Sequence, residues 1–397
     1  MLNKLFEISE KAIEESGTDF IRPQIAYLQQ NERLIGIKGS KGVGKTTLLL
    51  QYAKIHLKKN KKLYLSLDNP FFAGHNLLDY VDDYVKNGGD YLLLDEVHHY
   101  PDWSLSLKMI YDTFKNLKVI YTGSSLLHLT KGRADLSRRG MIYTLQGLSL
   151  REFINLTEKT DFAVLSLDDI LKNHSTLSKA VISKVKPILK YNEYIQWGYY
   201  PFFLENKENY LFKLMETINQ ILEAELPLVA KINYANVNKL KQLLQLISES
   251  VPFKPNLEKI SGQTSISKNT LKDYLFYLQE AMLILMLRSY KKTQSTLAKP
   301  EKIYMHNPNI MFGLAHENSN VGNLRECFFL NQLYLHNKVN YSESGDFLVN
   351  GKYTFEIGGK NKTYKQIAGI KNSYIAADDI EIGLNNTIPL WLFGFLY

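Results

Sequence analysis

The chain has 397 residues, of which 45% are hydrophobic and 22% are charged. These values are typical of globular proteins and exclude a disordered or fibrous chain, and the length favours two or three domains over one. The formal net charge of +8 is spread along the chain, so it permits a nucleic-acid partner without indicating one.

Cysteine use and hydropathy limit the compartment. The single cysteine, Cys327, excludes an internal disulfide framework and argues against a cysteine-based zinc site or a Cys–His hydrolase. The longest apolar runs, AMLILML and IPLWLFGFLY, are too short to span a bilayer, and the N-terminus lacks the apolar core of a signal peptide. We expect a cytoplasmic protein with no membrane partner.

The first 150 residues alternate short apolar runs with amphipathic stretches. This pattern predicts a parallel sheet covered by helices, that is, an α/β domain. The expected strands lie at 34–39, 62–68, 91–96, 118–125 and 141–148.

A phosphate-binding motif follows the first of these strands. GSKGVGKT matches the P-loop pattern G-x-x-x-x-G-K-[ST], and a helix follows it. Glycines allow backbone N–H groups to surround phosphate oxygens, a lysine reaches the β- and γ-phosphates, and the threonine hydroxyl binds Mg²⁺. We expect ATP to contact Gly39, Ser40, Lys41, Gly42, Val43, Gly44, Lys45, Thr46 and Thr47.

Two carboxylates end the third strand, YLLLDE. They fit a Walker B segment, in which Asp95 holds Mg²⁺ together with Thr46 and Glu96 orients the attacking water. A catalytic glutamate favours ATP hydrolysis over nucleotide binding alone. His98 and His99 follow, and we expect supporting or structural roles for them because a zinc site needs more ligands than this pair supplies.

The fourth strand ends in polar residues that could sense the γ-phosphate. Thr122, Ser124 and Ser125 are the candidates, of which Ser124 is preferred, and the alternative for each is a helix cap.

Arginines come next in TKGRADLSRRG. Arg133, Arg138 and Arg139 are candidates for an arginine finger, a group that stabilises the transition state and is often supplied by a neighbouring copy in an oligomer. Arg139 is preferred, and the alternative is a solvated surface arginine.

The middle of the chain is predicted to be helical. Residues 156–235 form a helical extension, interrupted at WGYYPFF (197–203). Residues 236–305 read as helix, helix, tight turn, helix and strand, the order of a winged helix. Five basic residues there could contact DNA phosphates without reading bases: Lys268, Lys272, Arg288, Lys291 and Lys292. A rigid spacer or partner-binding module is the alternative.

Three strings together resemble a known group: GSKGVGKTTLLLQYA, LLLDEVHHYPDWSLSLKMIYD and VIYTGSSLLHL followed by GRADLSRRGMIYTLQGLSLREF. The chain resembles bacterial and archaeal AAA-type ATPases that carry a C-terminal domain of unknown function related to the PD-(D/E)XK nuclease fold. YIQWGYYPFFLE and GNLRECFFLNQL extend the resemblance over nearly the whole chain. The resemblance implies an ASCE-type P-loop core (1–155), the helical extension, a winged helix and a PD-(D/E)XK-like α/β module (306–397).

This last module is expected to contain a helix at 322–336 and strands near 338–342, 346–349, 353–357, 374–376 and 390–397. Nucleases of this fold bind Mg²⁺ with an Asp and a Glu and place a Lys two residues after the Glu. Glu326, Asp346 and Glu356 fit the carboxylates, but Gly358 stands where the lysine belongs. Lys360 lies beyond the Gly-Gly pair, so we expect it to be a poor replacement and prefer a degenerate site.

The sequence therefore predicts a Mg²⁺-dependent ATPase that couples its nucleotide state to movement of the winged-helix and nuclease-like parts. DNA is one candidate on which this movement would act. The expected cofactors are ATP and Mg²⁺, and the expected further partners are DNA and a homo-oligomer. Two alternatives stay open: an ATP-regulated metal-dependent nuclease, and a nucleotide switch or scaffold that does not hydrolyse ATP.

Overall fold

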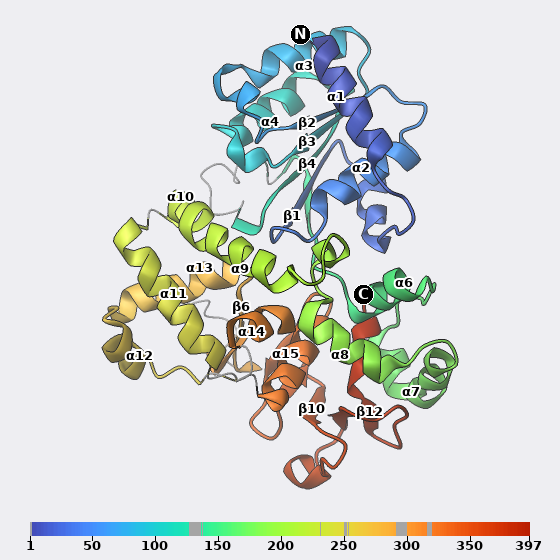
Figure 1. The fold of residues 1–397 in the computed structure, drawn as a ribbon, viewed down its shortest axis with the longest axis vertical. Helices are drawn as coiled ribbons and strands as arrows, with labels where there is room; N and C mark the ends of the chain where they lie inside the picture. The colour runs from blue at the N-terminus through green and yellow to red at the C-terminus, as the bar shows by residue number, and fades with distance from the viewer. Residues whose placement is uncertain are drawn as a thin grey trace. The chain divides into compact units, whose positions relative to one another are not determined.

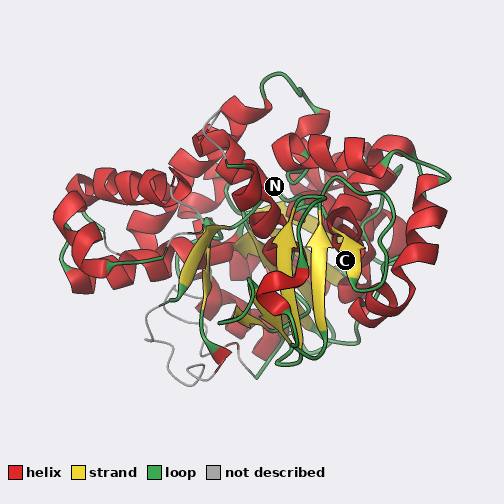
Figure 2. Ribbon diagram, turned by 90° about the horizontal axis from the view of Figure 1, so that it is seen from below, coloured by secondary structure: helices red, strands yellow, loops and turns green. Residues whose placement is uncertain are grey.

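The computed structural model describes residues 2–126, 136, 138–230, 232–249, 252, 254–290, 300–315 and 320–397. The chain divides into two compact units, Met1–Gly147 (unit 1) and Leu148–Tyr397 (unit 2). Both contain helices and strands, so the chain is an α/β protein (Figure 2). The finer division at residues 155, 235 and 305 stays a prediction.

Unit 1 is built on a five-stranded sheet in which every neighbouring pair is parallel. The strand order is β2-β3-β4-β1-β5. The predicted parallel sheet is thus confirmed, with β1 at Leu34–Gly39, β2 at Lys62–Ser66, β3 at Tyr91–Asp95, β4 at Lys118–Ser124 and β5 at Met141–Thr144.

Helices cover this sheet (Figure 1). They are α1 (Leu2–Glu15), α2 (Lys45–His56), α3 (Leu77–Lys86) and α4 (Trp103–Thr113). One buried apolar cluster joins side chains of α3 and α4 to the strands, among them Val81, Leu92 and Leu107. Because the strands are buried on both faces, their sequences are continuous apolar runs and were easy to predict.

The strand order decides where the site forms. Since β4 lies between β1 and β3, the P-loop after β1 and the carboxylates after β3 meet at the carboxyl edge of the sheet, on either side of the end of β4. Ligands of open α/β sheets bind at this edge.

Unit 2 begins with helices (Figure 1). These are α6 (Leu150–Glu158), α7 (Leu167–Ile182), α8 (Pro187–Trp197), α9 (Tyr210–Gln220), a π-helical turn (Ile221–Glu225) and α10 (Leu226–Ala230). The expected interruption is present between α8 and α9. It contains the 3₁₀ turn Pro201–Leu204.

Three helices and an antiparallel two-stranded ribbon follow, in the predicted order. They are α11 (Tyr234–Glu249), α12 (Leu257–Thr264), α13 (Lys268–Glu280), β6 (Ile284–Leu287) and β7 (Lys302–Met305). The ribbon is connected to the next sheet, because Ser289 forms a parallel bridge with Tyr341 of β8. The winged-helix interpretation stays a prediction.

The C-terminal part of unit 2 is a mixed sheet in the order β12-β11-β10-β9-β8. The helices α14 (Pro308–Ala315) and α15 (Val321–Leu333) precede it. Its strands are β8 (Val339–Tyr341), β9 (Phe347–Val349), β10 (Tyr353–Gly358), β11 (Ser373–Ala377) and β12 (Thr387–Pro389). On α15, Phe329 packs on Phe355 of β10, with ring centroids 5.0 Å apart.

One strand prediction was wrong. Residues 390–397 were expected to be a strand, but β12 ends at Pro389 and Leu390–Phe395 form a 3₁₀ helix. Residues 390–397 are all buried, so the segment is apolar on every side. Such a run has no periodicity that could distinguish a strand from a helical turn.

Candidate functional site

The loop between β1 and α2 needs its glycines for two reasons. Gly42 and Gly44 have φ angles of 82° and 92°, in the left-handed region that favours glycine. At Gly39, a Cβ atom would lie 2.4 Å from the carbonyl oxygen of Leu145. The backbone therefore turns back on itself and presents its N–H groups at the start of α2.

Lys45 holds its ammonium group inside this loop. Its side chain is 4% exposed, and Nζ donates to the carbonyl oxygens of Gly39 and Ser40, each at 3.2 Å. Nζ also lies 3.7 Å from Oε1 of Glu96. Of the other predicted loop residues, Ser40 and Val43 are buried, whereas Lys41 and Thr47 are exposed.

Asp95, at the end of β3, is buried and accepts hydrogen bonds from three hydroxyl groups. Thr46 Oγ1 and Tyr64 OH donate to Oδ2 at 2.7 and 2.9 Å, and Thr122 Oγ1 donates to Oδ1. Burial raises the pKa of Asp95, and these donors oppose that shift. The Thr46 and Asp95 oxygens lie together and are the hard ligands that Mg²⁺ takes in proteins, so this pair fits the ion.

Glu96 is held in a conformation that few residues adopt. Its φ of 51° places it in the left-handed region, and its backbone N–H donates to Thr122 Oγ1 at 3.0 Å. Strained residues of this kind persist where surrounding contacts over-determine them and are common at functional sites. As a result, the side chain, 25% exposed, lies beside the ammonium group of Lys45.

His98 links the Walker B loop to the end of β4. Its Nδ1 accepts from the backbone N–H of Ser124 at 3.3 Å and lies 3.3 Å from Glu96 Oε2. Burial lowers the pKa of His98 to about 3, so the ring is neutral and its contact with Glu96 is not an ion pair. Ligand atoms of Glu96, His98 and His99 lie within 4.8 Å of one another. We assign these three residues to the phosphate site and not to a separate metal site, because the ammonium group of Lys45 already faces the Glu96 carboxylate.

Two further residues of this region were missed from the sequence. Tyr64 contacts Asp95, and Arg22 donates to the carbonyl oxygens of Val43, Gln146 and Gly147 at 3.2, 2.8 and 3.0 Å. Tyr64 belongs to an apolar strand and Arg22 precedes the motif by 17 residues, so neither carried a signal.

The preferred arginine finger is engaged elsewhere. Arg139 donates from Nε and Nη2 to the two carboxylate oxygens of Asp112 at 3.0 and 2.9 Å, and this pairing lowers the pKa of Asp112. Arg138 is exposed. Arg133 lies outside the described residues.

In unit 2, one lysine faces two of the carboxylates that were predicted to act together although they lie far apart in the sequence, Glu326 and Asp346. Lys302, on β7, lies 3.4 Å from Glu326 Oε2 and 3.3 Å from Asp346 Oδ1. Tyr304 OH donates to Glu326 Oε2 at 2.6 Å, and the backbone N–H of Ile357 donates to Asp346 Oδ2 at 2.9 Å. Burial and the Asp346 charge raise the pKa of Glu326, whereas the two carboxylates together raise the pKa of Lys302 despite its burial.

Glu356 of β10 is 1% exposed. Its Oε1 lies 2.5 Å from Lys362 Nζ, and its Oε2 has no hydrogen-bond partner in the described part of the chain. Burial raises the pKa of this carboxyl group. Lys360, the lysine singled out from the sequence, instead lies 3.3 Å from Asp379. The residues missed here are Lys302 and Lys362.

The basic residues predicted to contact DNA differ in exposure. Lys268 and Lys272 are exposed on α13, and Lys268 pairs with Glu258 at 2.7 Å. Arg288 is about half-buried, which lowers its pKa. Lys291 and Lys292 lie outside the described residues.

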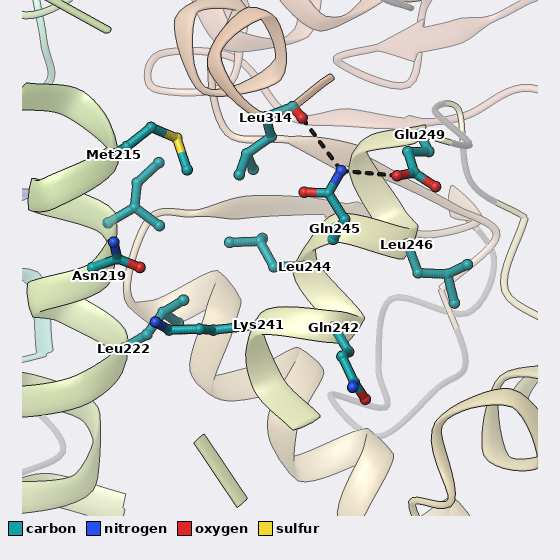
Figure 3. A pocket seen from close by; sticks show the side chains of 11 residues that line it. Met215, Asn219, Leu222, Lys241, Gln242, Leu244, Gln245, Leu246, Glu249 and Leu314 are labelled. Carbon is teal, nitrogen blue, oxygen red and sulfur yellow. Dashed lines mark hydrogen bonds between the residues drawn. The ribbon is translucent and has the colours of Figure 1, made fainter. Parts of the chain in front are cut away.

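An apolar cavity of about 510 Å³ lies between α9 and α11 (Figure 3). Met215 and Leu222 face it from one side. On the other side Gln245 donates to Glu249 Oε1 and to the Leu314 carbonyl oxygen at 2.8 and 3.3 Å. Lys241, which also lines the cavity, pairs with Glu223 at 2.5 Å. We assign it no ligand.

The P-loop, the buried Asp95 and the order of the parallel strands define a P-loop nucleotide-binding core. Residues 31–154 match the family described as AAA domain, and residues 188–321 match the family described as Domain of unknown function (DUF8612). Unit 1 therefore contains a P-loop nucleotide-binding core that is similar to the AAA domain family. In the described part of the chain, no helix combines the length and the apolar character needed to cross a bilayer.

Two curated relatives come from Methanocaldococcus jannaschii, and both are described as uncharacterized proteins. The first is 28% identical over 399 residues, which covers 92% of this chain and 84% of the relative. The second is 24% identical over 282 residues, which covers 68% of this chain and 59% of the relative.

Among solved structures, a RuvB variant from Thermotoga maritima is 16% identical, with a TM-score of 0.30 over 73% of this chain and 90% of that one. C. elegans PCH-2 is 13% identical, with a TM-score of 0.26 over 70% and 66%. AMPPCP-bound DnaA from Aquifex aeolicus is 16% identical, with a TM-score of 0.25 over 70% and 87%. These TM-scores are too low to support the fold, which rests on the geometry and the family match.

Proposed function

We propose that the chain is a Mg²⁺-dependent ATPase. The observation that carries this proposal is the convergence of Lys45, Thr46, Asp95 and Glu96 at the carboxyl edge of one parallel sheet. A nucleotide with its Mg²⁺ would bring an electrophilic γ-phosphorus whose charge is partly neutralised. The chain supplies the ammonium group of Lys45, the oxygens of Thr46 and Asp95, and a carboxylate.

Glu96 is the group that orients and polarises water in this proposal. It is partly exposed, it lies beside Lys45, and its backbone is fixed by Thr122. His98 Nδ1 lies 3.3 Å from the other carboxylate oxygen, and because burial lowers the pKa of His98, the neutral ring leaves the charge of Glu96 intact. Its Nδ1 accepts from the backbone N–H of Ser124, so the hydrogen bond ties the turn after Glu96 to the end of β4, where the γ-phosphate would be sensed.

Two variants test the ATPase. Lys45→Ala should abolish ATP binding, measured by calorimetry, because the loop loses its only buried ammonium group. Glu96→Gln should bind ATP like the wild type but lower kcat for phosphate release by a factor on the order of 100. Lys41→Ala, an exposed lysine of the same loop, is the matched control. Unchanged ATP affinity in Lys45→Ala would contradict the proposed ATP-binding site. Full turnover in Glu96→Gln would mean that another residue orients the attacking water.

A homo-oligomer in which Arg139 reaches a neighbouring copy's nucleotide belongs to this proposal. Arg139 must then leave Asp112. Because this ion pair is partly exposed, breaking it costs little free energy. Light scattering with and without ATP tests the assembly. An Arg139→Ala chain that assembles and hydrolyses ATP like the wild type would exclude the finger.

The second candidate function is a metal-dependent phosphodiester site in unit 2. The observation that favours it is a pair of neighbouring ion-pair contacts, in which Lys302 faces the partly exposed Glu326 and Asp346, and Lys362 faces the buried Glu356. Carboxylate oxygens are ligands that Mg²⁺ and Mn²⁺ take, and Glu356 Oε2 is buried without a hydrogen-bond partner among the described residues. Lys302 and Lys362 are paired with these carboxylates, so an ion would have to displace them. A bound ion would polarise a phosphodiester, and DNA that also contacts Lys268 and Lys272 is the proposed substrate.

Calorimetry with Mn²⁺ tests this second candidate, with Lys45→Ala as the background so that the P-loop does not contribute a nucleotide-linked signal. Asp346→Asn should abolish binding, whereas Asp379→Asn, an exposed carboxylate outside the cluster, should not. Equal Mn²⁺ affinity in the Asp346→Asn chain would contradict a metal site and favour a degenerate fold.

A further inference from the structure

We infer, building on the ATPase proposed above, that Tyr64 is a positioning residue of the nucleotide site. Its hydroxyl group fixes the Asp95 carboxylate, and this fixation sets the affinity of the site for Mg²⁺. Tyr64 itself contacts neither the nucleotide nor the attacking water in this role.

Tyr64 reaches Asp95 from the neighbouring strand. β2 and β3 are parallel, and Ser66 of β2 stands opposite Asp95 of β3. Tyr64 precedes Ser66 by two residues, so the side chains of all three lie on the same face of the sheet. The phenol ring is long enough to extend along this face, and its hydroxyl group donates to Asp95 Oδ2 at 2.9 Å.

Hydroxyl donors use most of the acceptor capacity of Asp95. A carboxylate offers about four acceptor sites, two on each oxygen. Oδ2 accepts from Thr46 and Tyr64, and Oδ1 accepts from Thr122. Among the residues that the structure describes, no fourth donor contacts this side chain, so one acceptor site remains, on Oδ1. The donors therefore determine which part of the carboxylate can respond to a cation.

Tyr64 differs from the other two donors in what else it does. Thr46 is assigned to the metal ion itself, and Thr122 Oγ1 also accepts the backbone N–H of Glu96. A change at either threonine would therefore disturb more than the Asp95 carboxylate. Loss of the Tyr64 hydroxyl group changes the carboxylate but leaves the P-loop and Glu96 in place.

The backbone of Tyr64 is held by the N-terminal helix. β2 is at the edge of the sheet, where N–H groups on the outer side have no strand partner. The N–H of Tyr64 donates instead to Oγ of Ser9 on α1, at 2.8 Å. Ser9 is fully buried and Tyr64 is buried. Because the backbone and the hydroxyl group are both fixed, the ring holds the carboxylate in one rotation.

This fixation matters for metal binding because hydrogen-bonded partners orient a carboxylate toward its ion. Loss of such a partner typically lowers metal affinity by a factor of roughly 10 to 100. In Tyr64→Phe the ring remains but Oδ2 loses one of its two donors. The carboxylate can then turn, so that part of the free energy of Mg²⁺ binding is spent on orienting it.

The test separates metal binding from nucleotide binding. The probe is AMPPCP, an ATP analogue that is not hydrolysed, titrated into the full chain by calorimetry in EDTA and at increasing Mg²⁺ concentrations. Tyr64→Phe should bind AMPPCP in EDTA like the wild type, because the P-loop is intact. The Mg²⁺ concentration that gives half of the metal-dependent gain in affinity should rise roughly tenfold.

ATP turnover gives a second readout. At saturating ATP, excess Mg²⁺ should restore most of the wild-type kcat in Tyr64→Phe, since Lys45 and Glu96 are unchanged. A merely structural role of Tyr64 would instead lower kcat at every Mg²⁺ concentration.

Tyr84→Phe is the matched control. Tyr84 is also buried in unit 1, but its hydroxyl group donates to the carbonyl oxygens of Lys61 and Tyr91 at 2.6 and 2.8 Å and not to Asp95. This variant should keep the Mg²⁺ dependence of the wild type. Ser9→Ala is a second variant, which releases the backbone of Tyr64 and should shift the Mg²⁺ dependence in the same direction by a smaller factor. Circular dichroism should show that each chain is folded.

The outcomes separate the role of Tyr64 from the ATPase. A wild-type chain whose AMPPCP affinity does not respond to Mg²⁺ would contradict the Mg²⁺-dependent ATPase and the role of Tyr64 with it. A wild-type response that is unchanged in Tyr64→Phe, or shifted equally in Tyr84→Phe, would overturn the role of Tyr64 alone. A kcat that excess Mg²⁺ does not restore would also overturn it. If Tyr64→Phe does not fold, unchanged Mg²⁺ dependence in Ser9→Ala would decide against the role.

Discussion

At the scale of residues, the two candidate sites differ in how their charges are balanced. Asp95 is buried among three hydroxyl donors, so its charge is stabilised without a directly paired cation. In unit 2, Lys302 pairs with the partly exposed Glu326 and Asp346, and Lys362 pairs with the buried Glu356. The first arrangement leaves Asp95 available to a cation, whereas in the second a metal ion has to compete with Lys302.

Buried histidines give unit 2 a dependence on pH. His306 is fully buried, its Nε2 lies 2.9 Å from Tyr334 OH, and burial lowers its pKa to about 3. In the unfolded chain His306 takes up a proton near pH 6.5, whereas in the folded chain it stays neutral down to about pH 3. Its contribution to the free energy of unfolding is therefore fully present above pH 6.5 and is lost as the pH falls toward 3. The loss should reach roughly 2 kcal/mol at pH 5.

Hydrogen exchange of residues 302–311, corrected for intrinsic rates, measures this effect at pH 7.5 and pH 5.0. His306→Gln should remove most of the difference between the two pH values, because glutamine does not titrate. His56→Gln, at an exposed histidine of unit 1, should leave the difference unchanged. An equal pH dependence in His306→Gln would assign it to other groups.

At the scale of elements, one asparagine fixes three helices of unit 2. Asn309 lies in the first turn of α14 and is fully buried. Its Nδ2 donates to the carbonyl oxygens of Tyr194 and Ile195 at 2.8 and 2.9 Å, at the end of α8. Its Oδ1 accepts from the Tyr199 N–H at 2.8 Å and from the hydroxyl group of Tyr210, the first residue of α9.

Asn309→Ala should therefore lower the free energy of unfolding of unit 2 by about 3 kcal/mol or more, because it leaves several buried polar groups without partners. Urea denaturation followed by circular dichroism measures the change. Asn361→Ala, on the surface turn, is the control and should be near neutral. A small effect of Asn309→Ala would mean that water replaces the amide at this junction.

The prediction of elements failed where local pattern and tertiary environment disagreed. Strands of unit 1 alternate with helices and carry turn residues between them, so each could be placed within a few residues. The 390–397 segment is buried on all sides and has no such signal, and it folds as a 3₁₀ helix. The turn after β10 shows the same limit, since its effect on Lys362 depends on how the chain folds back.

At the scale of the whole molecule, the sequence predicts that nucleotide binding in unit 1 alters unit 2. ATP at 100 times its dissociation constant should stabilise unit 1 by about 2.7 kcal/mol, because only the folded P-loop binds it. Coupling requires, in addition, that exchange in unit 2 responds to the same ligand.

Hydrogen exchange with and without ATP and Mg²⁺ tests both statements in one experiment. We expect protection of residues 39–47 and 95–98 together with a change in 148–397, and neither change in Lys45→Ala. Protection confined to unit 1 would contradict the coupling and leave ATP binding intact. It would favour an isolated nucleotide switch over an ATPase that drives domain movement.

The sequence by itself determined the P-loop core. Phosphate binding depends on a local motif, from Gly39 to Thr46, and on carboxylates that end a recognisable strand, so local patterns carry the necessary information. Glu326, Asp346 and Glu356 could also be proposed, because each lies on a predictable helix or strand.

Only the tertiary structure decided which groups contact these carboxylates. Tyr64 contacts the Walker B residue Asp95 from another strand, and Lys302 reaches Glu326 and Asp346 from a ribbon 24 residues or more away in sequence. Lys362 reaches Glu356 only because a turn folds it over Gly358. Long side chains on different elements meet through packing and chain reversal, and neither leaves a periodic trace in the sequence.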